Sequence, residues 1–178
     1  MSGAPLLTAP LGPRIAAYTV DLLLVTLGAI GLAVATVLLF SGALARRGGP
    51  PIALDETGRF QLNPGASPEA IMTFAIVMLV ALLLALLWYH GYFVWLEAHR
   101  GGQTLGKRLF RIRVVSHNGS PITVRQATWR DLARYIDVGL LFPGLLMPLM
   151  DPEKAGRRLG DRIAGTRVIR AESTPPVP

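Results

Sequence analysis

A long apolar stretch interrupted by a single acidic residue constrains this sequence more than any other feature. Residues 15–40 contain no lysine or arginine and one carboxylate, that of Asp21. A helix of this length reaches about 39 Å at 1.5 Å per residue, which exceeds the roughly 30 Å hydrocarbon core of a bilayer. We therefore predict that residues 14–40 form a first transmembrane helix, preceded by a loose segment at residues 1–13.

The position of Asp21 makes it a candidate functional residue. It lies seven residues after Arg14, about two helical turns into the apolar zone, where an unpaired carboxylate costs at least a few kcal/mol. Arg14, Tyr18 and Asp21 share one helix face at i, i+4 and i+7. Gly28 and Ala35 continue that face. We expect it to contact another helix, because small residues permit close approach and the buried acid needs a partner.

A second transmembrane helix is predicted at residues 70–97, after the start signal Ser67-Pro68-Glu69. If the two helices are antiparallel, with Arg14 and Glu97 at one interface, Asp21 and His90 lie at the same depth and are a candidate acid–imidazole pair. The alternative places His90 within an interfacial aromatic cluster. That cluster consists of Trp88, Tyr89, Tyr92, Phe93 and Trp95.

Composition supports an integral membrane protein and excludes several kinds of site. The 178 residues are 51% hydrophobic, and the mean hydropathy is +0.44, above what a soluble domain of this size needs. The absence of cysteine excludes disulfides and thiolate ligands. The three histidines lack metal-ligand spacing, and no nucleophile elbow or close carboxylate pair is visible. We predict no metal, no cofactor and no enzymatic activity.

The basic residues predict the topology. The segment 98–131 carries seven lysines and arginines against three in the loop 41–69, so the positive-inside rule places residues 98–131 and the N-terminus in the cytoplasm and the loop outside. The formal charge of +7 favours anionic lipids as partners. Nucleic-acid binding is the weaker alternative, since no binding motif is present. The expected headgroup contacts are Lys107, Arg108, Arg111 and Arg113.

A third apolar segment, residues 132–150, contains Asp137 and several prolines and glycines. It fits poorly with a continuous lipid-facing helix. Residues 151–178 also carry six basic residues that favour the cytoplasm. A re-entrant hairpin turning at Pro143-Gly144 keeps both basic segments on one side, whereas a third full span would export the tail.

Short elements are predicted in the cytoplasmic part. Residues 111–115 and 121–124 flank a turn signal and are expected to form a β-hairpin, and residues 166–170 could pair with 111–115. Residues 126–135 form an amphipathic pattern with Trp129 on its apolar side, typical of a helix in the headgroup plane.

Two further motifs have competing interpretations. Residues 101–107 match the start of a P-loop, GxxxxGK, but Arg108 occupies the position that needs Ser or Thr. We expect the glycines to turn the chain sharply away from the bilayer instead. Ala43-Leu44-Ala45 resembles a signal-peptide cleavage site, yet the preceding apolar region is far longer than a signal sequence requires.

Three stretches together resemble the RDD family of small bacterial membrane proteins, named for one arginine and two aspartates. These are Arg14 with Asp21, GGQTLGKRLFRIRVV after the second span, and LGDRIAGTRVI near the end. The resemblance covers about residues 10–170. It implies that Arg14, Asp21 and Asp161 are the family residues, with Asp137 as the other candidate for the second aspartate. It also implies transport of an unidentified ligand, or sodium and proton exchange.

The sequence thus predicts an all-α membrane protein of the bacterial inner membrane, forming a single domain. It should have two full transmembrane helices, a re-entrant or third membrane segment, and a small cytoplasmic β-element. The first functional hypothesis is a transport component for a small cation, with Asp21 as its ion-binding carboxylate. Two spans cannot enclose a pathway, so a homo-oligomer or a larger complex is required. The alternative is an accessory or assembly subunit whose charged residues lock the fold.

Overall fold

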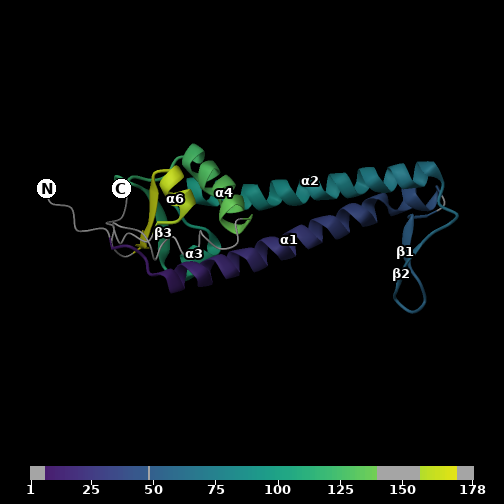
Figure 1. The fold of residues 1–178 in the computed structure, drawn as a ribbon, viewed down its shortest axis with the longest axis horizontal. Coiled ribbons are helices and arrows are strands. Elements are labelled where there is room, and N and C mark those ends of the chain that lie inside the picture. Colours follow the sequence, from purple (N-terminus) through teal and green to yellow (C-terminus); the bar gives the residue numbers. More distant parts are fainter. Residues whose placement is uncertain (1–6, 48, 140–156, 172–178) are drawn as a thin grey trace. The chain divides into compact units, whose positions relative to one another are not determined.

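A computed structural model describes residues 7–47, 49–139 and 157–171 (Figure 1). The chain divides into two compact units. The first unit comprises residues 1–25 and 89–178, and the second unit comprises residues 26–88. Helices α1 (Leu11–Ala45) and α2 (Pro68–His99) are each divided between the two units, with one end in the first unit and the other end in the second.

Helices α1 and α2 are long and apolar enough to cross a membrane. Their large apolar side chains are mostly exposed; Leu39, for example, is 80% exposed. Such exposure is what lipid-facing positions require, whereas the core helix of a soluble protein would bury them. The predicted start of the second span is confirmed, since the Ser67 hydroxyl accepts from the Ala70 N–H at 3.1 Å.

The inward face of α1 differs in detail from the predicted one. Arg14 and Asp21 are buried as expected, but farther along the helix the buried positions are Val25, Thr36 and Leu44, and Ala35 is exposed. Gly28 meets the prediction of close approach within the second unit, because a Cβ there would lie 2.5 Å from the Trp88 indole nitrogen. The absent side chain therefore makes room for a bulky ring.

A two-stranded hairpin occupies the loop between the long helices. Strand β1 (Ile52–Leu54) pairs antiparallel with β2 (Phe60–Leu62). Asp55 organises the turn, because its carboxylate accepts from the backbone N–H groups of Thr57 at 2.8 Å and Arg59 at 2.9 Å, and from the Gln61 side chain at 2.8 Å.

Removing the Asp55 carboxylate should loosen this hairpin selectively. Asp55→Ala is expected to speed trypsin cleavage after Arg59 severalfold, while Glu56→Ala, which removes an adjacent exposed acid, should leave it unchanged. Equal cleavage of the two variants would contradict the assignment. Bonds from Arg59 and Thr57 lower the pKa of Asp55 from its usual 3.8. The order it provides is therefore complete above that pKa and is lost as pH falls through the lowered value.

The first unit contains a second small sheet flanked by short helices. Strand β3 (Ile112–Ser116) pairs antiparallel with β4 (Thr166–Arg170), with Val114 opposite Val168. This confirms the predicted pairing of residues 166–170 with 111–115. The chain before α1 is less loose than predicted, because Ala9 donates to the Val168 carbonyl at 3.1 Å and Thr8 bridges Ile169.

The predicted hairpin between residues 111–115 and 121–124 is wrong. Thr123 instead caps the start of α4 (Val124–Gly139). The Thr123 hydroxyl accepts from the Gln126 N–H at 3.2 Å, and the Gln126 side chain accepts from the Thr123 N–H at 3.0 Å. This reciprocal capping box uses the backbone that a strand would have needed. Helix α4 contains the predicted amphipathic helix at 126–135.

Helix α4 also crosses the boundary predicted at residues 131 and 132, so the basic segment and the start of the third apolar segment form one helix. Residues 140–150, with the predicted turn at Pro143-Gly144, lie outside the described residues, as do the side chain of Asp137 and, in the segment 151–178, residues 151–156 and 172–178.

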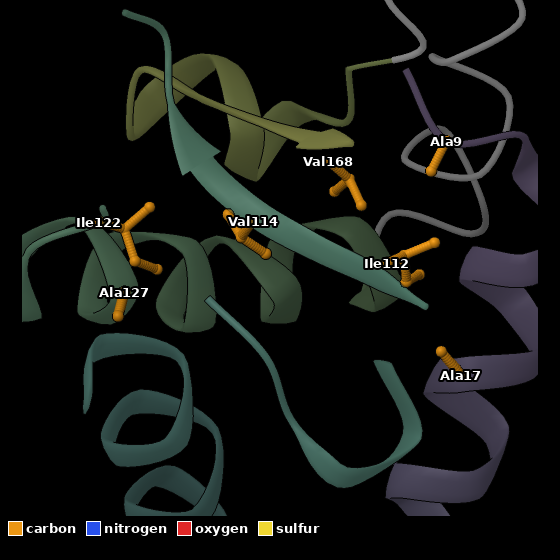
Figure 2. Close-up of a cluster of buried hydrophobic side chains, with 7 residues drawn as sticks. All are labelled: Ala9, Ala17, Ile112, Val114, Ile122, Ala127 and Val168. Carbon is orange, nitrogen blue, oxygen red and sulfur yellow. The ribbon is translucent and has the colours of Figure 1, made fainter. Parts of the chain in front are cut away.

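The apolar core of the first unit is small (Figure 2). It gathers side chains from β3, β4, α1 and α4 around the sheet, with Val114 fully buried. Its members are Ala9, Ala17, Ile112, Val114, Ile122, Ala127 and Val168. Several are alanines, so hydrophobic burial here is modest, and much of the buried interior of this unit is charged.

Candidate functional site

The Asp21 carboxylate is buried, with 1% of the residue exposed, and three donors from other elements bind it. Tyr92 of α2 donates its hydroxyl at 2.7 Å, and Gly106 donates its backbone N–H at 2.7 Å. The Thr104 hydroxyl donates to the second oxygen. Such bonds stabilise the charged form of a carboxylate away from water.

The segment that resembled a P-loop supplies two of these donors. Gly101 and Gly102 have positive φ of 63° and 79°, which confirms the predicted sharp turn. Thr104 then caps α3 (Leu105–Leu109) and, with Gly106, reaches Asp21. The loop therefore uses its donors on a carboxylate of its own chain.

Arg130 of α4 joins two buried carboxylates. Its Nε donates to Glu97 at 3.1 Å, and its Nη1 pairs with Asp161 and donates to the Thr166 hydroxyl at 2.7 Å. Glu97 also pairs with Lys107. Only 1% of Glu97 and 2% of Asp161 are exposed.

The charges of this cluster act on one another. Burial alone would lower the pKa of Arg130, but Asp161 and Glu97 outweigh that effect and raise it. The pKa of Lys107 is lowered, chiefly by burial and then by Arg130, against the opposing effect of Glu97. Lys107 was predicted to contact lipid headgroups; it instead points toward Glu97.

His90 belongs to a different cluster from the one predicted. Its Nδ1 pairs with Asp131 of α4, and its Nε2 lies 2.9 Å from the Tyr135 hydroxyl. The predicted pairing of Asp21 with His90 is therefore wrong. The structure agrees better with the alternative, in which His90 lies within the aromatic cluster, since the His90 ring packs edge-on against Tyr89 with the ring centroids 5.5 Å apart. The two side chains take different partners.

Arg134 completes the second cluster. It pairs with Asp131 at 3.1 Å, and its guanidinium lies 3.8 Å from the centroid of the Phe93 ring, with Tyr18 and Tyr89 also within 6.0 Å. Stacking on aromatic faces fixes the orientation of a guanidinium. Burial alone would lower the pKa of Arg134, but Asp131 raises it.

Sequence reasoning did not identify five of these residues as site residues. Arg130, Asp131 and Arg134 are buried or half-buried on α4 and form ion pairs, while the apolar Trp129, Leu132 and Tyr135 between them are about half exposed. The i, i+1, i+4 spacing of charges between apolar residues was a usable signal. Tyr92 and Thr104 gave no such signal, because nothing in their spacing pointed to Asp21.

The remaining predicted site residues are placed as follows. Arg14 is 5% exposed and donates to the Val168 carbonyl of β4 at 3.1 Å. Arg108 and Arg111 are exposed, and Arg113 is half-buried. Asp161 also accepts from the Arg158 N–H at 3.0 Å, at the start of α6 (Leu159–Ile163).

A cavity of about 60 Å³ lies among these groups in the first unit. Arg14, Asp21 and Asp161 all line it, so the structure brings the three predicted residues together around one space. The other charged residues of the lining are Lys107, Arg130, Arg134 and Arg158. At about 10–15 Å³ for each water, the space holds a small polyatomic group or a few waters.

The part of the chain that the structure describes contains no group of three or more His, Asp or Glu residues that could hold a metal ion. The lining is dominated by cations, which repel a metal.

Comparisons with known proteins agree with the geometry. A model described as the RDD family matches residues 8–165. A proline-rich antigen homolog of Mycobacterium tuberculosis, in strains CDC 1551 / Oshkosh and ATCC 25618 / H37Rv, is 35% identical over 79 residues. The match covers 42% of this chain and only 32% of the length of those relatives. No solved structure matches the chain.

Proposed function

The chain belongs to the RDD family, and on that premise we propose that it is a multi-pass protein of the bacterial inner membrane that takes part in the transport of a small ligand. Two helices of sufficient length and hydropathy support the membrane location. The excess of basic residues in segment 98–131 supports cytoplasmic termini.

The observation that carries the proposal is the cavity lined by Arg14, Asp21 and Asp161. Charged residues that only lock a fold need no space between them, because direct pairing is what stabilises buried charges. Here they surround room for a ligand. Two spans are too few to enclose a pathway, so the proposal includes a homo-oligomer or a larger membrane complex.

The geometry favours a ligand class other than the predicted cation. Tyr92, Thr104 and Gly106 already donate to Asp21, so a cation bound there would displace these donors or share the oxygens with them. The lining also contains more basic than acidic residues. Asp21 is therefore better suited to hold α1 against α3 and to border the cavity than to bind a cation directly.

Reconstituted vesicles test the transport role. Protein in proteoliposomes loaded with a pH-sensitive dye should show protein-dependent flux when challenged with sodium chloride or with sodium phosphate. Asp21→Asn should reduce the flux at least tenfold, because one donor would then face an amide N–H in place of an oxygen. Asp55→Asn, an isosteric change in the exposed hairpin, should leave it intact. Absence of flux in the unaltered protein, or full flux in Asp21→Asn, would end the transport proposal.

Orientation is separately testable, because the sequence has no cysteine. Glu56→Cys in the β1–β2 hairpin should react with an impermeant maleimide added to intact spheroplasts. His117→Cys, in the turn after β3, should react only after permeabilisation. Both side chains are exposed, so reactivity reports the side of the membrane. The reverse pattern would invert the proposed topology.

An accessory or assembly role is the second candidate. The mutual pairing of Glu97, Lys107, Arg130 and Asp161 favours it, since such a network fixes one arrangement of helices without any ligand. Purification in mild detergent distinguishes the two: a stoichiometric unrelated partner, with no flux after reconstitution, would establish the accessory role.

The bilayer itself is a proposed partner in both cases, through the exposed apolar face of α4.

A further inference from the structure

We propose that the cavity beside Asp21 binds a phosphate group, either as free inorganic phosphate or as the headgroup of an anionic lipid. The inference rests on the proposed function, whose ligand class it specifies. It starts from the charges: five cationic side chains line the cavity, namely Arg14, Lys107, Arg130, Arg134 and Arg158, against the two carboxylates of Asp21 and Asp161.

Carboxylates behind the lining do not remove this excess. Glu97 accepts from Lys107 and Arg130, and Asp131 pairs with Arg134, so these two acids reduce the positive excess around the cavity from three to one. The lining acids are also engaged: Asp21 accepts from three donors, and Asp161 accepts from Arg130 and from the Arg158 N–H. An entering anion meets carboxylates that are already stabilised by donors.

The distribution of the cations indicates the shape of the anion. They come from four separate places: Arg14 from α1, Lys107 from α3, Arg130 and Arg134 from α4, and Arg158 from the residue before α6. One arginine suffices to hold a planar carboxylate in a bidentate manner. Cations arriving from several elements match a tetrahedral group, which presents oxygens in several directions and carries up to two charges.

Size and pre-organisation agree with phosphate. A space of about 60 Å³ accommodates roughly four to six water-sized spheres, comparable to the five heavy atoms of phosphate. The Arg134 guanidinium is fixed by the Phe93 ring at 3.8 Å, so its ordering costs little on binding. Tyr18 and Phe93 also line the cavity, in the parts of α1 and α2 that belong to the first unit, and the proposed topology puts these parts toward the cytoplasmic headgroup phosphates.

The binding experiment uses purified full-length protein in detergent. Inorganic phosphate should raise Tm in a saturable manner relative to sodium chloride at equal ionic strength. Arg158→Gln should weaken the apparent affinity about tenfold or more, the loss expected for a charge-assisted hydrogen bond. Arg162→Gln is the matched control, because Arg162 is an exposed arginine of α6, the short helix that directly follows Arg158, and is not part of the lining. It should bind phosphate as the unaltered protein does.

A second arm distinguishes the two sources. Native mass spectrometry should detect retained phosphatidylglycerol if the headgroup is the ligand, and added phosphatidylglycerol, but not phosphatidylcholine, should then raise Tm while phosphate has little effect. A response to phosphate without retained lipid identifies the free anion. Both results support the site.

The inference is overturned if neither phosphate nor phosphatidylglycerol stabilises the unaltered protein, a result that does not depend on any variant folding. It is also overturned if Arg162→Gln weakens binding as much as Arg158→Gln, since surface charge would then explain the effect. Binding without vesicle flux would leave this site standing and end the transport proposal. Flux with no binding of either probe would end the phosphate-site proposal and leave the transport proposal standing.

Discussion

Replacing Gly106 with alanine should destabilise the protein by about 3 kcal/mol or more. A Cβ at this position would lie 2.2 Å from the Ala17 carbonyl oxygen and 2.9 Å from the Asp21 carboxylate. Overpacking costs about 1–3 kcal/mol, and losing a hydrogen bond to a buried charge adds about 1.5–3 kcal/mol. The gain in helix propensity from glycine to alanine, at most about 1 kcal/mol, is too small to compensate.

The measurement is thermal unfolding in detergent, followed by tryptophan fluorescence. Gly91→Ala in α2 is the control, because nothing lies within 4 Å of a Cβ built there. It should be neutral or slightly stabilising. Equal stability of the two variants would show that α3 does not approach α1 as closely as the Gly106 contacts require.

The second large effect is expected at Arg130. Arg130→Met keeps much of the side-chain volume but leaves Glu97 and Asp161 without their shared cation, and removing one partner of a buried pair costs about 3–5 kcal/mol. Arg125→Met, an exposed arginine on the same helix, should change the free energy of unfolding by no more than about 0.5 kcal/mol.

A double variant separates charge from packing. Adding Asp161→Asn to Arg130→Met removes one of the stranded charges, so part of the lost stability should return. Denaturant unfolding of the two variants in the same detergent measures this coupling. If the double variant is less stable than Arg130→Met, Arg130 acts through its packing, and the ion-pair interpretation is wrong.

The sequence predicted those features that depend only on the order and spacing of residues along the chain. The two long apolar helices, the Ser67 start and the burial of Asp21 all followed from hydropathy and spacing. The pairing of residues 166–170 with 111–115 followed because the basic residues of both segments predicted one side of the membrane for them, so that two extended segments could meet. For these features, local pattern and final structure agree.

The remaining features depend on the rotation of a helix about its axis, on competition between local structures, or on contacts between distant residues. Depth in the membrane placed His90 level with Asp21, but it carried no information on helix rotation, and His90 pairs with Asp131. Residues 121–124 had a strand pattern, yet the Thr123–Gln126 capping box starts α4 at Val124, and residues 121–123 form no strand. The donors to Asp21 come from sites 71 to 85 positions away, a separation that no local pattern specifies.

The hydrogen bond from Arg14 to Val168 joins residues 154 positions apart. Bacterial ribosomes add about 5–20 residues per second, so roughly 8–30 s of synthesis separate the two. If α1 inserts as a transmembrane helix, as proposed, it reaches the bilayer while β4 is still unmade. In that case the nascent protein passes through a stage in which the Arg14 guanidinium lacks its β4 acceptor and must be held by lipid phosphates, water or an insertion factor.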